Sequence, residues 1–309
     1  MNKTVYAGTY TGNGSEGIYA FSFEDGILSD PSLFCRIRNP KYVHYEKGVL
    51  ATVCDTENGS GCALINDAGE IEDVVAFEKE TSCFITRKDD TLYTANYHAG
   101  TFSIVDIVDG RLKFNRTVRI QEGAGCHQVI LHGDDIMVPS LFLDRVLIDR
   151  DGKFSSIRFT QGTGPRHGVI TRDGRYLYLA SELSNELFVI DLESGEIKAQ
   201  MSVLPDGEKH KRDTAAIRLS EDEKYIYVST RTMDIISVFE VTDHQPKLIQ
   251  VVSCLGRHPR DFIILDGYLL CANRYSNTVV SMKINEDGTI GRLVSTITVP
   301  QSVSLAVRQ

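Results

Sequence analysis

One short pattern recurs seven times along the 309 residues, and this repeat constrains the fold more than any other feature of the chain. Each copy is a run of apolar or small residues that ends near Ala, Ser or Thr and is usually followed by a polar residue. The copies begin 41 to 49 residues apart. They lie at residues 5–9, 50–54, 92–96, 136–140, 177–181, 226–230 and 269–273. A period of this length is typical of a four-stranded propeller blade, so the sequence predicts one all-β domain over residues 1–309, a seven-bladed β-propeller.

Each repeat unit has the same order of predicted strands and turns. An apolar strand precedes the recurring run, and a tight polar turn separates the two, for example at residues 173–174. A third strand follows, as at residues 101–105 and 187–190, and a further turn leads to a fourth, outer strand. Patterns of long helices are absent from the sequence, so we expect almost no helix.

The two ends of the chain hold complementary incomplete units. The first unit begins at its second strand, because no inner strand precedes Val5. Residues 302–307 form an inner-strand pattern with no unit left to follow it. We therefore expect this C-terminal strand to pair into the first blade and close the ring, which removes an exposed strand edge.

Composition limits the location and the partners of the protein. Hydrophobic residues make up 42% and charged residues 24%, as in ordinary soluble proteins. No apolar run approaches the roughly 20 residues that span a bilayer, and the start lacks the apolar core of a signal peptide. We expect a cytoplasmic protein without a membrane partner, either a monomer or a weak homo-oligomer. The net charge of −9 disfavours nucleic acid as a partner.

We expect no metal or other cofactor. The seven cysteines are odd in number and form no C-x-x-C pair, which argues against a disulfide framework or a zinc site. Cys83, Cys254 and Cys271 lie in apolar runs, and we interpret them as small buried hydrophobic residues. Carboxylates do not cluster as a calcium or magnesium site requires. The G-x-S-x-G and H-E-x-x-H motifs are also absent.

Propeller geometry gathers polar residues at one end of the central channel, which we call the mouth. Residues just before each inner strand and just after each second strand meet there, whereas the tight turns lie on the opposite face. The predicted mouth residues are Tyr97, His98, His127, Arg166, His167, Glu182, Arg231, Arg260 and Arg274. An arginine at a strand end is commonly a surface salt bridge, but four together should repel one another unless they bind something anionic. We therefore expect a small anion as the ligand.

The chemistry of these residues suits water attack on an ester. Arginine presents a planar fork that matches carboxylate and phosphate, and it can stabilise the oxyanion that forms at an ester carbonyl. A glutamate among arginines stays ionised at neutral pH and can accept a proton from water. The intrinsic pKa of a histidine lies near neutrality, so His167 could share that role.

Several segments carry a family resemblance along nearly the whole chain. The most specific is Gly-Thr-Gly-Pro-Arg-His at residues 162–167, and residues 95–97, 173–178, 227–231 and 259–262 also match. With these motifs the chain resembles the lactonase family of seven-bladed propellers, which includes bacterial 6-phosphogluconolactonases and fungal carboxy-muconate cyclases. The resemblance implies hydrolysis of a sugar δ-lactone, first of all 6-phosphogluconolactone of the pentose phosphate pathway. It places the catalytic cluster on Arg166, His167, Glu182 and Arg231.

The chain departs from the family pattern at three places. An Asp-Leu-Gly motif common around blade four is replaced by the sequence of residues 139–145. Thr232 stands where a glycine usually follows the arginine of blade six, and Arg274 stands where blade seven usually has glutamine. Arg274 adds a cation to the predicted mouth.

The working hypothesis is metal-independent hydrolysis of a phosphorylated or carboxylated sugar lactone. Glu182, with His167, would activate water, and Arg166 and Arg231 would polarise the lactone carbonyl. Arg260 or Arg274 would then hold the anionic group. His98, His127 and Tyr97 are further candidates for substrate contact.

Two other functions remain open at this point. The same mouth could serve a muconate-type lactone-forming cyclase, or a non-enzymatic propeller that binds an anion or a protein. The mixed-charge segment at residues 208–213 is interpreted as a solvated loop that could also fold over the mouth as a lid.

Overall fold

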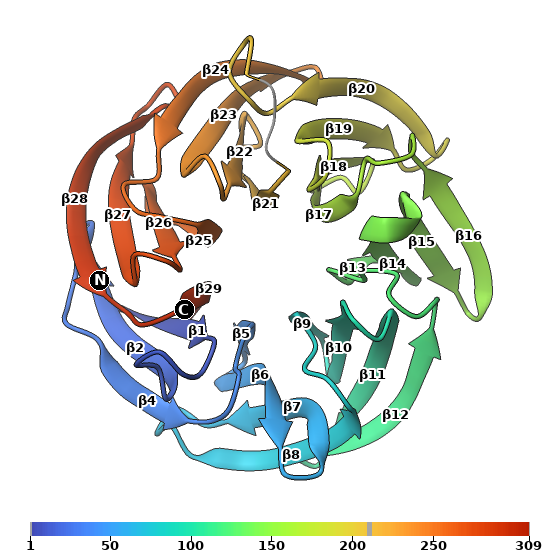
Figure 1. Ribbon diagram of the computed structural model, residues 1–309, viewed down its shortest axis with the longest axis vertical. Helices are drawn as coiled ribbons and strands as arrows, with labels where there is room; N and C mark the ends of the chain where they lie inside the picture. Colours follow the sequence, from blue (N-terminus) through green and yellow to red (C-terminus); the bar gives the residue numbers. More distant parts are fainter. Residues whose placement is uncertain (1, 209–211, 309) are drawn as a thin grey trace.

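The computed structural model describes residues 2–208 and 212–308, and within these ranges the chain forms seven antiparallel sheets around a central axis (Figure 1). This confirms the predicted seven-bladed β-propeller. One short 3₁₀ turn, η1 (Leu141–Leu143), is the one helical segment of the described ranges. In six blades the four strands follow one another along the chain, from the channel to the rim, whereas blade one takes its inner strand from the C-terminal end of the chain.

The strands occupy four concentric positions. The inner strands are β29 (Ser302–Arg308), β5 (Val43–Glu46), β9 (Phe84–Lys88), β13 (Ile130–His132), β17 (Pro165–Ile170), β21 (Thr214–Leu219) and β25 (Pro259–Leu265). The second strands are β1 (Lys3–Thr9), β6 (Val49–Thr56), β10 (Thr91–Asn96), β14 (Asp135–Ser140), β18 (Tyr176–Ser181), β22 (Tyr225–Thr230) and β26 (Tyr268–Asn273). The third strands are β2 (Gly17–Glu24), β7 (Gly59–Ile65), β11 (Thr101–Val108), β15 (Arg145–Arg150), β19 (Glu186–Asp191), β23 (Ile235–Thr242) and β27 (Thr278–Ile284). The outer strands are β3 (Ile27–Leu28) with β4 (Ser32–Arg36), β8 (Ile71–Glu78), β12 (Arg111–Arg119), β16 (Lys153–Arg158), β20 (Glu196–Ser202), β24 (Gln245–Ser253) and β28 (Ile290–Thr298).

Blade one differs from the others in its outer strand. Both β3 and β4 pair with β2, so a divided strand replaces the continuous one. Pro31 lies between the two pieces. Proline has no backbone N–H to donate to a ladder, which is why it interrupts an edge strand at this point.

The C-terminal strand closes the ring as the sequence predicts. Strand β29 pairs antiparallel with β1, with Ala7 opposite Leu305 and Gly8 opposite Ser304. A Cβ atom at position 8 would lie 2.4 Å from Ser304 Oγ and 2.6 Å from the Pro40 carbonyl oxygen. Glycine at this position therefore permits the close approach of three segments at the point of closure.

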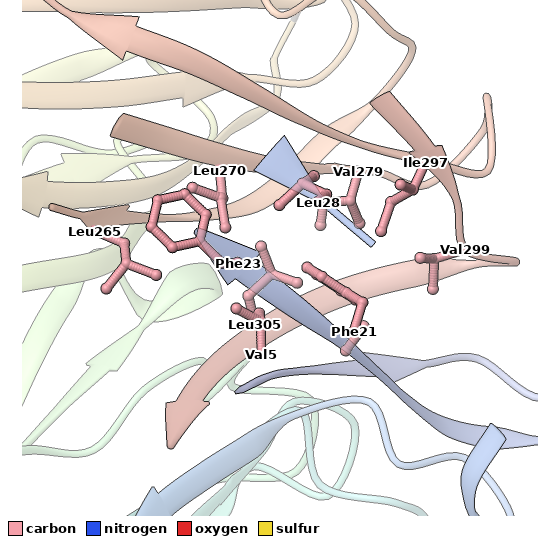
Figure 2. Packing of buried hydrophobic residues seen from close by; sticks show 12 residues of the cluster. Val5, Phe21, Phe23, Leu28, Leu265, Leu270, Val279, Ile297, Val299 and Leu305 are labelled. Carbon is pink, nitrogen blue, oxygen red and sulfur yellow. The ribbon is translucent and has the colours of Figure 1, made fainter. Parts of the chain in front are cut away.

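The core lies between neighbouring blades. Where blade one meets blade seven, Val5, Phe21, Phe23, Leu270 and Leu305 belong to one buried cluster (Figure 2). Alternation along β1, β2 and β29 places these side chains on the face that packs against the adjacent blade. The first and last blades are thus joined both by a hydrogen-bonded ladder and by a shared core.

Replacing Leu305 by alanine should lower the free energy of unfolding by about 2–4 kcal/mol, because it removes a buried side chain from a packed cluster. Leu305 is 5% exposed. The measurement is urea unfolding of the purified protein. Leu293→Ala is the matched control, since Leu293 lies on β28 of the neighbouring blade and is 45% exposed. Equal losses for the two variants would contradict a role of Leu305 in ring closure.

Candidate active site

The mouth is built by the same backbone contact in successive blades. The residue that follows a second strand donates its N–H to the segment that precedes the inner strand of the same blade. Glu182 N donates to Gly164 O at 2.7 Å, and Arg231 N donates to Asp213 O at 3.1 Å. Arg274 N makes the equivalent bond to His258 O at 3.1 Å. This contact places the polar side chains after the second strands around one opening.

Two of the arginines occupy bulges at the start of inner strands. In blade five, Pro165 lies opposite Ser181 and His167 opposite Ala180, so Arg166 is the extra residue. Blade seven has the same irregularity at Arg260. A bulge changes the direction of the side chain at that position and is frequent next to active sites. The bulges therefore direct both guanidinium groups independently of the strand's regular alternation.

Glu182 is held between two arginines at the centre of the site. Its Oε2 accepts a hydrogen bond from Arg166 Nε at 2.7 Å, and its Oε1 lies 2.9 Å from an Nη atom of Arg231. The same Arg231 nitrogen donates to Asp213 Oδ1 at 2.8 Å. Arg166 also donates to the Ala215 carbonyl at 2.6 Å. The carboxylate and the two guanidinium groups thus form a rigid ionic cluster.

The charges of this cluster persist near neutral pH. Burial tends to raise the pKa of Glu182, but Arg166 and Arg231 outweigh it and hold that pKa below its usual value. Burial and the charge of Arg231 lower the pKa of Arg166 to about 10, still well above neutrality. Glu182 is therefore an ionised carboxylate beside two protonated guanidinium groups.

Glu182 and Arg231 line a polar cavity of about 210 Å³, which we call the reaction pocket. Its lining residues are Tyr10, Lys41, Thr81, Cys83, Tyr97, His98, His127, Glu182, Arg231 and Arg260. They come from all seven blades, as expected for a cavity at the mouth of the channel. The pocket can hold a small polar molecule against one carboxylate and several cations.

A pair of histidines lies on one side of the reaction pocket. His127 Nδ1 and His167 Nε2 are 3.0 Å apart, and both rings are buried. Burial and the charge of Arg166 hold the pKa of both far below the usual value, so both are neutral. His167 Nδ1 has no hydrogen-bond partner in the described part of the chain. This favours the tautomer in which His167 Nε2–H donates to His127 and His127 carries its proton on Nε2.

The structure brings six of the predicted residues to the reaction pocket and leaves three outside its lining. Glu182, Arg231, Arg260, His98, His127 and Tyr97 line it. Arg166, which is 1% exposed, and His167 lie behind that lining, in contact with Glu182 and His127 respectively. Arg274 lies against the Tyr10 ring at 4.0 Å and donates to Gln301 at 3.1 Å. These three can act on a ligand through their neighbours.

Four pocket residues were not among the predicted site residues, namely Tyr10, Lys41, Thr81 and Cys83. Tyr10 follows β1 as Glu182 follows β18, so its position in the repeat could have identified it. Burial tends to raise the pKa of Tyr10, but the nearby Arg260, Lys41 and Arg274 lower it below its usual value. Cys83 is a buried free thiol, as expected from its apolar surroundings, but it also borders the pocket.

Other predictions concern a metal, a membrane and the charged loop. No group of three or more His, Cys, Asp or Glu side chains in residues 2–208 and 212–308 is arranged to hold a metal ion. None of the helical structure in the same ranges has the length and hydropathy to cross a bilayer. Within the segment 208–213, residues 209–211 lie outside the described residues, whereas Asp213 contacts Arg231.

A seven-bladed propeller with a glutamate ion-paired to two arginines at its mouth defines the class of protein to which this chain belongs. Sequence comparison narrows this class. The profile of the family "Lactonase, 7-bladed beta-propeller" matches residues 4–307, and the chain belongs to this family. The resemblance noted from the sequence motifs is thereby confirmed.

Individual relatives agree with this assignment. The 6-phosphogluconolactonase of Bacillus subtilis is 29% identical to this chain, and the match covers 98% of each protein. A solved protein structure from Lactobacillus plantarum covers all of both chains with a TM-score of 0.91 and 27% identity. The periplasmic gluconolactonase of Pseudomonas aeruginosa has a TM-score of 0.90 at 22% identity, with 100% of this chain and 99% of that chain covered, and shares the fold.

Proposed function

We propose that this protein hydrolyses a sugar lactone to the open acid, with 6-phosphogluconolactone as its substrate, by metal-independent attack of water. The observation that carries the proposal is the ionised Glu182 held between Arg166 and Arg231 on the wall of a polar pocket. Membership of the lactonase family and the similarity to a 6-phosphogluconolactonase support the choice of substrate.

In the proposed reaction Glu182 removes a proton from a water molecule. Its two oxygens are engaged by arginines, but a carboxylate has about four acceptor positions, so a water can still donate to it. The water oxygen adds to the lactone carbonyl carbon. Arg231 and Arg260, which both line the reaction pocket, stabilise the negative charge that develops on the carbonyl oxygen. No metal ion is required for this charge stabilisation.

The intermediate then collapses and the ring opens. The bond between the carbonyl carbon and the ring oxygen breaks, and the ring oxygen takes the proton of His127 Nε2. Glu182 returns its proton to His127, so both groups regain their starting state and the product is a hydroxy acid. His127 is the catalytic histidine of this scheme, whereas from the sequence we expected His167 to help Glu182 activate water. The choice follows from position, because His127 borders the pocket and His167 lies behind it. Arg166 and His167 are positioning residues.

The test is a hydrolysis assay with 6-phosphogluconolactone in the presence and absence of EDTA, with the spontaneous rate subtracted. We expect catalysed hydrolysis that EDTA does not change. Glucono-δ-lactone and a muconate dicarboxylate serve as comparison substrates, and turnover of the muconate alone would favour the lactone-forming reaction instead. No rate above the spontaneous one on any lactone would overturn the proposed function.

A further inference from the structure

A second hollow adjoins the reaction pocket at the mouth, on the side of blades one to three. Its volume is about 400 Å³, and we call it the cation hollow. It is lined by Arg38, Lys41, Asp55, Thr56, Gly59, Ser60, Lys79, Glu80, Thr81 and His98. Lys41, Thr81 and His98 also line the reaction pocket, so the two cavities share a wall. A ligand larger than the reaction pocket can extend into the cation hollow.

The cations of this hollow are available to a ligand. Arg38 and Lys79 are exposed, and neither side chain has a hydrogen bond or an ion pair with any other described residue. Lys41 Nζ donates to the Thr81 carbonyl at 3.4 Å and lies 5.5 Å from the centre of the Tyr10 ring. An ammonium group has three donors, so Lys41 keeps donors for a ligand. Three permanent positive charges therefore surround the hollow.

The hollow also contains two carboxylates, Asp55 and Glu80, so positive charge remains in excess. Asp55 accepts hydrogen bonds from Asn39 at 2.6 Å and from Ser60 at 2.7 Å, and a further one from Thr81. These bonds engage both oxygens of the Asp55 carboxylate. The side chain of Glu80 is 60% exposed, and one of its oxygens lies 3.9 Å from His98 Nδ1. Glu80 can therefore move into solvent when an anion enters.

We propose that the cation hollow binds the phosphate monoester of a phosphorylated sugar lactone while the lactone carbonyl lies in the reaction pocket. This inference rests on the proposed function, and it names the residues that select a phosphorylated substrate. A phosphate monoester carries about −1.5 to −2 charges at neutral pH and pairs well with Arg and Lys. In this proposal the cations of the hollow hold the anionic group, a role that we expected from the sequence for Arg260 or Arg274. Arg274 is less suited to it because its guanidinium is held by Tyr10 and Gln301.

The kinetic test is the double variant Arg38→Gln/Lys79→Gln. We expect KM for 6-phosphogluconolactone to rise about 100-fold, from the loss of two charge-assisted contacts, while kcat stays within twofold. Hydrolysis of glucono-δ-lactone, which has no phosphate, should be unchanged. The control is Arg36→Gln/Lys47→Gln, which removes two exposed cations from blades one and two outside the hollow and alters net charge equally. Equal losses on both lactones, or an unchanged KM for the phosphorylated one, would overturn the inference.

Binding of the reaction products separates this inference from the proposed reaction. Calorimetry should show that 6-phosphogluconate binds the wild-type protein more tightly than gluconate does, and that the double variant loses this difference. If the wild-type protein hydrolyses no lactone but shows this pattern, the proposed reaction fails and the phosphate site stands. If it hydrolyses lactones but binds both products equally, the reaction stands and the phosphate site fails.

Discussion

Replacing Glu182 by glutamine lowers kcat for lactone hydrolysis by about 10³-fold, the usual size of the effect when a catalytic base is removed. Glutamine preserves the shape of the side chain but cannot take a proton from water. The propeller should still fold, with a lower melting temperature, because Glu182 belongs to none of the buried apolar clusters between the blades. The measurement combines initial rates, corrected for spontaneous hydrolysis, with circular dichroism and a thermal melt.

Glu193→Gln is the matched control for this variant. Glu193 is an exposed residue of the same blade, in the turn on the face opposite the mouth. Its substitution makes the same change in charge and should leave the rate unchanged. A folded Glu182→Gln protein with more than a tenth of the wild-type rate would remove Glu182 as the base.

The pH dependence of the wild-type enzyme tests the same assignment. The base must be deprotonated, and the arginines hold the pKa of Glu182 below that of an ordinary glutamate. The rate should therefore stay constant as the pH falls through the usual range of a carboxylic acid, and decline only at lower pH. In Glu182→Gln the residual rate should lack this acidic limb.

Replacing Arg231 by glutamine should lower kcat by about 10²- to 10³-fold, the effect expected when an oxyanion-stabilising donor is removed. Arg231 lines the reaction pocket and also holds Glu182 at 2.9 Å and Asp213 at 2.8 Å. Its loss therefore removes a positive charge near the developing oxyanion and leaves two carboxylates without their shared partner. The measurement is steady-state kinetics on the same lactone.

Arg231→Lys distinguishes charge from geometry. Lysine keeps the positive charge but lacks the planar fork that reaches two carboxylates at once, so we expect a rate between those of the wild type and Arg231→Gln. The defect should appear in kcat with little change in KM, because the interaction strengthens as the oxyanion forms. A change confined to KM would assign Arg231 to substrate binding instead.

The buried charges of the mouth have a structural consequence as well. Arg166 and Glu182 are both withdrawn from solvent, and removal of either one leaves the other without its nearest counter-charge. Such single changes are strongly destabilising in general. Glu182→Gln leaves Arg166 with the Ala215 carbonyl and no carboxylate, whereas Arg166→Gln leaves Glu182 paired with Arg231. The thermal melt of each variant is therefore measured before its rate is interpreted.

Three features could be predicted from the sequence alone: the number of blades, the closure of the ring by residues 302–307 and the face that carries the candidate site residues. These features depend on short-range regularities. Each repeat unit is long enough for one four-stranded blade, and antiparallel hairpins connect strands that are adjacent in the chain. Any residue that follows a second strand must then reach the mouth, which is why Glu182 and Arg231 were predicted to lie together.

The sequence could not predict which of the mouth residues line the reaction pocket. Arg166 and Arg260 both occupy strand bulges, yet the first is buried behind Glu182 and the second borders the pocket. Alternation along a strand cannot predict the direction of a bulged residue, because the bulge breaks the period of two. The choice between His127 and His167 was likewise set by packing between neighbouring blades.

The cation hollow was even harder to predict from the sequence than the lining of the reaction pocket. Arg38 and Lys41 lie in the connection between β4 and β5, whereas Lys79 lies in the connection between β8 and β9. Only the packing of neighbouring blades brings these two connections to one cavity. A regular repeat determines the path of the backbone, because each unit has the same order of strands and turns. The character of the site arises from side chains that differ between units, and their positions are settled only when all seven blades have packed together.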